Sequence, residues 1–283
     1  MAVALLVGGS GVLGQVLHAS AAGAVPDGDG PASSMQLVFA DSFEGSSLDA
    51  SVWATCYPWF HDPAAGCTNF GNADEKEWYL PSGDQVSGGI LHLVADEQPT
   101  EGTTRSGAPR SYPYSSGMLT TYRSFSFTYG YVDVVARLPG GAGTWPALWL
   151  LPTSWAWPPE IDIMENWGPH HAIRTTFHWR SAAGPECAGR WVSSAADLAS
   201  GWHSYGLLWR PGSLVWYLDG RVVDAYVGPN VPSVPMYFLA DLAISGAAAP
   251  HSSFDLRSVR IYQSGPGISR PEMVRAPSSV AGH

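Results

Sequence analysis

The chain consists largely of short segments in which apolar and polar residues alternate, separated by turn residues. These segments run from about residue 37 to residue 263, and residues 88–94, 125–134 and 215–223 are examples. The last example contains Asp219-Gly220, a dipeptide that favours a two-residue hairpin turn. No amphipathic helix of ordinary length stands out, and residues 195–200 have room for one short turn. Many short strands without intervening helices predict an all-β fold, an antiparallel sandwich or jelly roll.

Composition narrows the classes of function. The chain has 283 residues, of which 45% are hydrophobic and 13% charged, and its formal net charge is −10. This length and hydrophobic content allow one large β domain with a sizeable core. Lys76 is the only lysine, so the chain lacks the clustered basic residues that bind nucleic acid or an anionic membrane. We expect a monomer that binds an uncharged ligand.

The N-terminal residues predict secretion. Residues 2–24 are largely apolar, carry no Lys, Arg, Asp or Glu, and include small residues at positions 19–22. This pattern is typical of a signal peptide, here cleaved near Ala21 or Ala24. Residues 25–36 would form a linker, residues 37–264 the main domain and residues 265–283 a loose tail. We therefore expect an extracellular protein.

One motif in this N-terminal part favours a different function. Residues 9–14 match GxGxxG after an apolar run, as in a dinucleotide-binding oxidoreductase. Such a site requires a helix and then a second strand that ends in an acid. Linker-like sequence rich in Gly, Pro and Asp follows instead, so this interpretation is the weaker one.

The three cysteines leave the disulfide pattern open. Cys56 and Cys67 are close enough in sequence to bridge the loop between them, which would leave Cys187 without a partner. Three reduced thiols are the alternative, because spacing alone does not determine connectivity.

Three carboxylates within six residues, Glu160, Asp162 and Glu165, indicate the chemistry. Prolines precede the segment, Gly-Pro follows it, and isoleucines lie between the acids, so a strand is favoured over a helix. In a strand, Glu160 and Asp162 share one face, whereas Glu165 is out of step by one residue. A β-bulge near residues 163–164 would return Glu165 to that face. Three acids on one surface suit cleavage of a glycosidic bond; a solvated strand face is the alternative.

A series of further motifs, in order along the chain, resembles glycoside hydrolase family 16, the laminarinase-like β-glucanases. The motifs lie at residues 39–45, 48–49, 53, 77–79, 116–119, 127–131, 143–151, 203–206, 209 and 216–220. The acid segment matches the family's bulged ExDxxE form rather than the unbulged ExDxE form. The resemblance implies a β-jelly-roll sandwich whose concave sheet carries an open sugar-binding cleft.

The resemblance also implies roles for the three acids in a retaining mechanism. Glu160 would be the nucleophile and Glu165 the general acid and base, while Asp162 would assist Glu160 by a hydrogen bond and by its charge. Crowded carboxylates raise the pKa of at least one member, which keeps an acid protonated near neutrality.

Aromatic and polar residues near these acids are candidates for substrate binding. Trp145 and Trp149 share one face of a strand by the period of two, and Trp167 follows the acids. Indole rings pack on the C–H faces of sugars, although a core position is the alternative, most of all for Trp149. His178 could bind a sugar hydroxyl or a catalytic carboxylate, or could be structural. The remaining polar candidates are Asn69, Asn72 and Glu77.

The expected enzyme is a secreted, endo-acting hydrolase of internal β-1,3 or mixed β-1,3/1,4-glucan linkages, with a polysaccharide as its partner. A galactan substrate, transglycosylation and a non-catalytic carbohydrate-binding protein on the same scaffold remain alternatives. The chemistry requires no cofactor. Some relatives hold a structural calcium through an aspartate; here Arg257 occupies that position, and Asp255 could substitute.

Overall fold

The computed structural model describes residues 30–60, 62–70, 75–247 and 251–265. The predicted signal peptide, the first part of the linker and the tail from residue 266 lie outside the described residues. The expected linker is structured from Gly30, because the short 3-10 helix η1 (Gly30–Ser34) leads directly into the first strand. Among the described residues, no helix has the length and apolar character needed to span a bilayer.

The described part of the chain is almost entirely β-structure, as predicted. Besides η1 there are two further short 3-10 helices, η2 (Pro63–Ala65) and η3 (Pro81–Gly83). The strands are β1 (Gln36–Asp41), β2 (Glu77–Tyr79), β3 (Asp84–Ser87), β4 (Ile90–Asp96), β5 (Thr100–Thr103), β6 (Pro109–Tyr112), β7 (Tyr114–Ser116), β8 (Met118–Thr120), β9 (Gly130–Arg137), β10 (Thr144–Pro152), β11 (Glu160–Glu165), β12 (Ala172–Ser181), β13 (Gly184–Ser193), β14 (His203–Arg210), β15 (Ser213–Leu218), β16 (Arg221–Val227), β17 (Met236–Ile244) and β18 (His251–Gln263).

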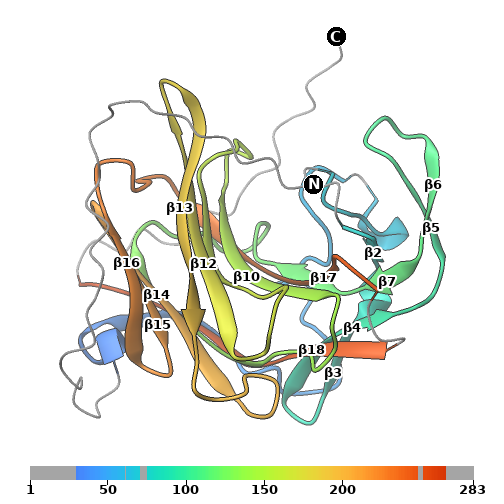
Figure 1. Cartoon of the computed structure of the whole chain (residues 1–283), viewed down its shortest axis with the longest axis horizontal. Helices are drawn as coiled ribbons and strands as arrows, with labels where there is room; N and C mark the ends of the chain where they lie inside the picture. Colours follow the sequence, from blue (N-terminus) through green and yellow to red (C-terminus); the bar gives the residue numbers. More distant parts are fainter. Residues whose placement is uncertain (1–29, 61, 71–74, 248–250, 266–283) are drawn as a thin grey trace.

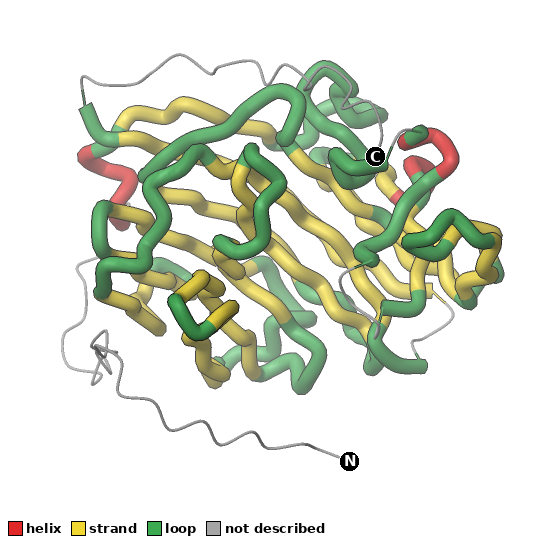
Figure 2. The backbone as a smooth tube through the Cα atoms, turned by 90° about the horizontal axis from the view of Figure 1, so that it is seen from above, coloured by secondary structure: helices red, strands yellow, loops and turns green. Residues whose placement is uncertain are grey.

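Two large sheets form a sandwich (Figure 1), which confirms the predicted fold class. The ten-stranded sheet has the order β16-β15-β14-β9-β18-β4-β7-β2, with β1 beside β18 and β3 beside β4. The six-stranded sheet has the order β13-β12-β11-β10-β17-β8. The two-stranded β5–β6 hairpin stands beside β2 and β7 (Figure 1). Seen from above, the strands of a sheet run side by side across the molecule, and the short helices lie at its margins (Figure 2).

The main core lies between the two sheets and explains the alternation in the sequence. Alternate residues of β10, such as Leu148 and Leu150, are fully buried there. Residues of the opposite face of the same strand, Ala147 and Trp149, belong to a second cluster that includes Cys56 and Cys67. Strands of the six-stranded sheet are thus buried on both faces along part of their length, so apolar side chains there do not by themselves indicate the core side.

One predicted hairpin and one predicted strand can be compared with the structure. The hairpin at Asp219-Gly220 is confirmed, since both residues have positive φ (50° and 72°) between β15 and β16. The strand expected over residues 125–134 begins only at Gly130. Tyr129, the residue before β9, has a φ of 61°, and this left-handed backbone angle is incompatible with a continuous strand through that position.

A disulfide joins Cys56 and Cys67, with 5.8 Å between the Cα atoms, and Cys187 is free and exposed. The bridge therefore has the pairing that the sequence left open. It fixes a loop that packs against the second cluster, next to Tyr79 and Trp149.

Candidate active site

The acid segment forms strand β11, and a β-bulge brings its three carboxylates to one face. Asp162 pairs with Thr176 of β12, and the next pair joins Glu165 with Arg174, so two residues of β11 lie opposite one residue of β12. Those two residues, Ile163 and Met164, both pack in the core between the sheets. The predicted bulge is confirmed, and it turns Glu165 to the same side as the other two acids.

Three cross-strand rows extend this face over β12 and β13. Glu160 lies opposite His178, Asp162 opposite Thr176, and Glu165 opposite Arg174. On β13 the rows continue with Cys187, Gly189 and Trp191, respectively. Directly paired residues project on the same side of a sheet, so all nine positions face the same surface.

Glu160 and Asp162 share a histidine. The Nε2 atom of His178 lies 3.5 Å from Oε1 of Glu160 and 3.3 Å from Oδ2 of Asp162. The indole N–H of Trp157 donates to Oε2 of Glu160 at 3.1 Å. Of the roles predicted for His178, the contact with the carboxylates is the one that the structure contains.

Glu165 is held separately. The indole N–H of Trp145 donates to its Oε1 at 3.0 Å, and the hydroxyl of Thr176 donates to its Oε2 at 3.5 Å. Asp162 is fixed through its backbone as well, because Trp216 of the opposite sheet donates to its carbonyl oxygen at 2.9 Å. Glu160 and Glu165 therefore have separate indole donors, Trp157 and Trp145, which limit the rotation of their carboxyl groups.

The electrostatics of the three acids favour retention of a proton. Burial raises the pKa of Glu160 well above its ordinary value, and the charge of Asp162 raises it further, whereas His178 and Trp157 lower it. Burial and the charge of Glu165 raise the pKa of Asp162. Burial raises the pKa of Glu165, against the hydrogen bond from Trp145. Interacting carboxylates do not all ionise together near neutrality, so a general acid and an ionised nucleophile can coexist.

A second group of acids is buried beside these three. Asp241 of β17 accepts the indole N–H of Trp149 at 2.6 Å and the hydroxyl of Tyr79 at 3.1 Å. It occupies the row of Glu165, two strands away, with only Ala147 between them. Burial raises the pKa of Asp241 to about 7 despite the hydrogen bonds.

Glu77 belongs to this buried group, and its predicted place in a substrate subsite is wrong. Its side chain is fully buried, and its carboxylate accepts the backbone N–H of Ile244 at 2.7 Å. Glu75 lies beside it, and burial together with the charge of Glu77 raises the pKa of Glu75. The sequence made Glu77 a candidate polar group of a substrate subsite, whereas in the folded protein its carboxylate is bonded to the backbone of β17 and is not accessible to a ligand.

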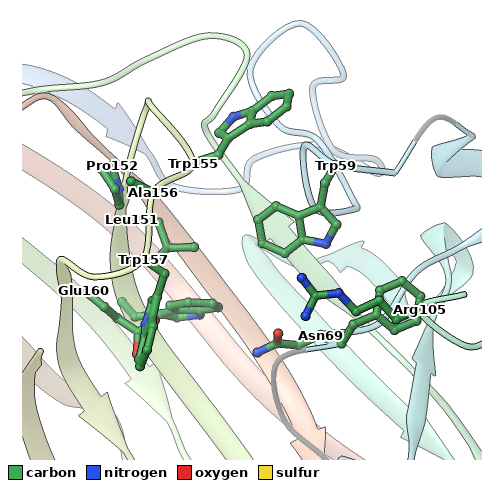
Figure 3. A pocket seen from close by; sticks show the side chains of 11 residues that line it. Trp59, Asn69, Arg105, Leu151, Pro152, Trp155, Ala156, Trp157 and Glu160 are labelled. Atoms are coloured by element: carbon green, nitrogen blue, oxygen red, sulfur yellow. The ribbon is translucent and has the colours of Figure 1, made fainter. Parts of the chain in front are cut away.

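A cleft with a volume of about 790 Å³ opens along the face that carries Glu160. Its aromatic lining comes from Trp59, Trp149, Trp155 and Trp157. Figure 3 shows Trp157 and Glu160 on one side of the cleft, and Asn69 and Arg105 on the other. An aromatic cleft with a few polar groups is typical of a carbohydrate site.

On the other side of the acids, toward β12 and β13, three tryptophans make a continuous series. The ring centroids of Trp145 and Trp167 are 5.2 Å apart, and those of Trp167 and Trp191 are 5.0 Å apart. The guanidinium of Arg174 lies 5.9 Å from the ring centre of Trp167. Trp167 and Trp191 remain 41% and 38% exposed, so their rings are accessible to a ligand.

The predicted substrate residues thus lie in different places. Trp145 and Trp167 flank the acids, and Asn69 lines the cleft. Trp149 is 8% exposed and belongs both to the core and to the cleft lining, the two roles considered for it. His178 contacts the acids, and Glu77 is buried. Asn72 lies outside the described residues.

Sequence reasoning missed several residues of the site: Trp59, Arg105, Trp155, Trp157 and Trp191. Trp157 lies three residues before Glu160, and that proximity was an available signal. Trp155 lies in the same loop, between β10 and β11. The other three, Trp59, Arg105 and Trp191, come from loops and strands that are distant in sequence, for which the periodicity of a single strand contains no information.

The calcium site suggested by the resemblance has an unsuitable donor set. The carboxylate of Asp255 accepts from Arg137 at 2.5 Å and contacts Nδ1 of His92 at 2.7 Å. The hydroxyl of Ser253 donates to it as well. Calcium needs several free oxygen ligands, whereas this carboxylate is already neutralised by a guanidinium.

Comparison with known proteins supports the interpretation of this geometry. The model of glycosyl hydrolases family 16 matches residues 76–250, which include β11 and most of the cleft. The chain belongs to glycosyl hydrolases family 16. Within the family, it is 37% identical over 230 residues to the endo-1,3-1,4-beta-glycanase EglC of Rhizobium meliloti (strain 1021), an alignment that covers 75% of this chain and 47% of EglC. The chain thus spans about half the length of that relative.

Two further similar proteins are matched over most of their own length. The chain is 32% identical over 240 residues to the beta-glucanase of Rhodothermus marinus, covering 75% of this chain and 76% of that protein. The structure of a LamA variant from Z. galactanivorans, solved with laminaritriose and laminaritetraose, superposes with a TM-score of 0.67 at 27% identity, covering 81% of this chain and 99% of the other. The family assignment therefore rests on both sequence and fold.

Proposed function

We propose that this chain is an endo-acting, retaining β-glucanase that hydrolyses internal β-1,3 or mixed β-1,3/1,4 linkages. The observation that carries the proposal is the shared face of Glu160, Asp162 and Glu165 on bulged β11, next to an open cleft with aromatic walls. An open cleft suits cleavage within a long chain because neither end of the polymer has to enter a closed pocket. The names of EglC and of the Rhodothermus marinus protein support the substrate class.

The mechanism assigns a separate role to each of the two glutamates. The carboxylate of Glu160 attacks the anomeric carbon while Glu165 donates its proton to the glycosidic oxygen, so the C–O bond breaks and a glycosyl-enzyme ester forms. Glu165, now ionised, takes a proton from water, which attacks the same carbon and releases Glu160. The contact of His178 with both Glu160 and Asp162 supports the ionised nucleophile.

The decisive experiment compares four polymers: laminarin, lichenan, agarose and a xylan. We expect a rapid fall in the average chain length of laminarin or lichenan, and retention of the β-anomer in the first products by NMR. Cleavage of agarose alone would contradict the glucan assignment. Binding without cleavage of any polymer would favour the carbohydrate-binding alternative.

We further propose that the protein acts outside the cell as a monomer. The apolar N-terminal residues and the Cys56–Cys67 bridge support this, because disulfides persist in oxidising compartments. N-terminal sequencing of protein recovered from culture medium should begin near residue 22 or 25. Sizing chromatography should give the mass of one chain.

We propose that the fold holds no calcium through Asp255, since Arg137 and His92 occupy its carboxylate. The expected result is a melting temperature that is the same with excess chelator and with added calcium. A rise of several degrees on adding calcium would contradict this, because a ligand that binds the native state stabilises it.

A further inference from the structure

We propose that Arg105 makes the cleft a binding site for glucan chains that carry a carboxylate substituent. This rests on the proposed function, since it concerns which β-glucan the same cleft accepts. Nothing in the acid motif requires such a group. One guanidinium instead supports the proposal, through its position in the cleft, its chemistry and its lack of a partner among the described residues.

Arg105 lies in the turn between β5 and β6, far in sequence from the catalytic strand. It nevertheless lines the same cleft as Glu160 and Trp157. Figure 3 shows its guanidinium pointing into the cavity, below Trp59 and beside Asn69. A substrate that lies along the cleft from Glu160 therefore passes this group.

Arg105 has no ion-pair or hydrogen-bond partner among the residues that the structure describes. Other arginines of the molecule are engaged: Arg137 with Asp255, Arg260 with Asp133, and Arg110 over the ring of Tyr112. The chain has 24 acidic and 14 basic residues, yet no described carboxylate lies within ion-pair distance of Arg105. Its donors are available to a ligand.

The chemistry of the guanidinium selects the ligand. Its planar array of N–H donors matches a carboxylate in bidentate geometry, a stronger contact than one with a neutral hydroxyl. Conversely, Glu160 lines the cleft, Asp162 and Glu165 lie on the same face of β11, and negative charge on this face repels an anionic chain. A fixed positive charge on the wall offsets this repulsion at one position. The neutral parts of the chain would remain in contact with the tryptophans.

The test uses two polymers that differ only in the charge of the substituent: carboxymethyl and hydroxyethyl β-1,3-glucan of equal length and degree of substitution. For Arg105→Gln we expect kcat/KM on the carboxymethyl polymer to fall about 5–10-fold, in the range of a partly exposed charged contact. Activity on the hydroxyethyl polymer should stay within about twofold. Arg105→Lys should lie between, because it keeps the charge and loses the bidentate geometry.

Arg110→Gln is the matched control, since Arg110 belongs to the same hairpin but stacks on Tyr112. It should change neither activity. Added salt should reduce the effect of Arg105→Gln on the charged polymer. An equal loss on both polymers would make Arg105 a contact to neutral sugar and overturn the proposal, as would no loss on either.

Binding of both polymers to Glu160→Gln, with and without Arg105→Gln, separates this proposal from the proposed function. If the wild type cleaves neither polymer, the proposed hydrolase function fails. The preference for the carboxymethyl polymer in binding, and its loss in the double variant, still decide the role of Arg105. Equal binding of the two polymers before and after the substitution would overturn it.

Discussion

The two glutamates proposed to be catalytic differ mainly in the donors that surround them. Glu160 has His178 and Trp157, whereas Glu165 has Trp145 and Thr176. Hydrogen bonds to a carboxylate favour its ionised form, and burial opposes it. The balance at each position decides which carboxyl group attacks and which one keeps a proton.

Substitution of either glutamate should separate the two chemical steps. Glu160→Gln should lower kcat/KM on laminarin by about 10⁴-fold or more, as loss of a nucleophile does. Glu165→Gln should lose comparable activity on laminarin but regain part of it on an aryl glucoside whose leaving group needs no proton. Both variants should melt no lower than the wild type, because each removes a buried charge. Full activity of Glu160→Gln would contradict its role.

His178 should set the acidic limb of the pH profile. Its contact with Glu160 lowers the pKa of that carboxyl group. In His178→Asn, the pKa of Glu160 should rise, so a higher pH is needed to ionise the nucleophile. The acidic limb of kcat/KM should move upward by about 0.5–1 pH unit, within the range for loss of one close donor. An unchanged limb with lower kcat would assign His178 a contact with sugar only.

At the scale of elements, the bulge of β11 and the long β12–β13 hairpin form the site together. The bulge aligns Glu165 with Arg174, and that row ends at Trp191 of β13. The hairpin therefore extends the acid face by two strands and places an indole ring at its margin. Register, rather than sequence proximity, joins residues 165 and 191.

Trp191→Ala should weaken binding of long substrates. The exposed ring adds a sugar-stacking surface beside Trp167, and an aromatic contact contributes about 0.5–1.5 kcal/mol, or roughly 2–10-fold. We expect a rise in KM for long laminari-oligosaccharides and no change for a short aryl glycoside. Trp202→Ala is the control, because Trp202 packs under Arg257 on the other sheet. An equal effect of both substitutions would argue against a subsite at Trp191.

At the scale of the whole molecule, a group of carboxylates is buried next to the site. Asp241 accepts a hydrogen bond from Trp149 of the cleft lining, Glu75 and Glu77 belong to the same buried group, and burial raises the pKa of all three. Such groups favour the protonated form in the folded state. The free energy of unfolding therefore decreases as the pH rises, because the folded protein holds protons that the unfolded chain releases.

Asp241→Asn should reveal this cost. The pKa of Asp241 is about 7 in the folded state against an ordinary value of 3.8, so the folded protein binds more protons in that interval and loses stability as pH increases. Asparagine keeps an acceptor for Trp149 without the charge. The free energy of unfolding of the variant minus that of the wild type should therefore increase by at most about 4 kcal/mol from pH 4 to pH 8. Parallel denaturation profiles across this range would contradict the prediction.

The fold class was predictable from the sequence because strand alternation and turn residues are local signals. The Asp219-Gly220 hairpin is confirmed, since it depends on neighbouring residues only. The bulge at residues 163–164 is confirmed as well, in the register of β11 with β12. The late start of β9 at Gly130 was not predictable, because alternation does not report the positive φ of Tyr129.

The sequence by itself therefore determined the β-sandwich and the three carboxylates on one strand. Only the tertiary structure decided what surrounds them: it buried Glu77, placed Trp191 beside Trp167 and brought Arg105 to the cleft. The physical reason is that side-chain alternation assigns a residue to a face of its own strand. Which loop or strand then covers or extends that face depends on sheet order and register, and these arise from contacts between distant parts of the chain.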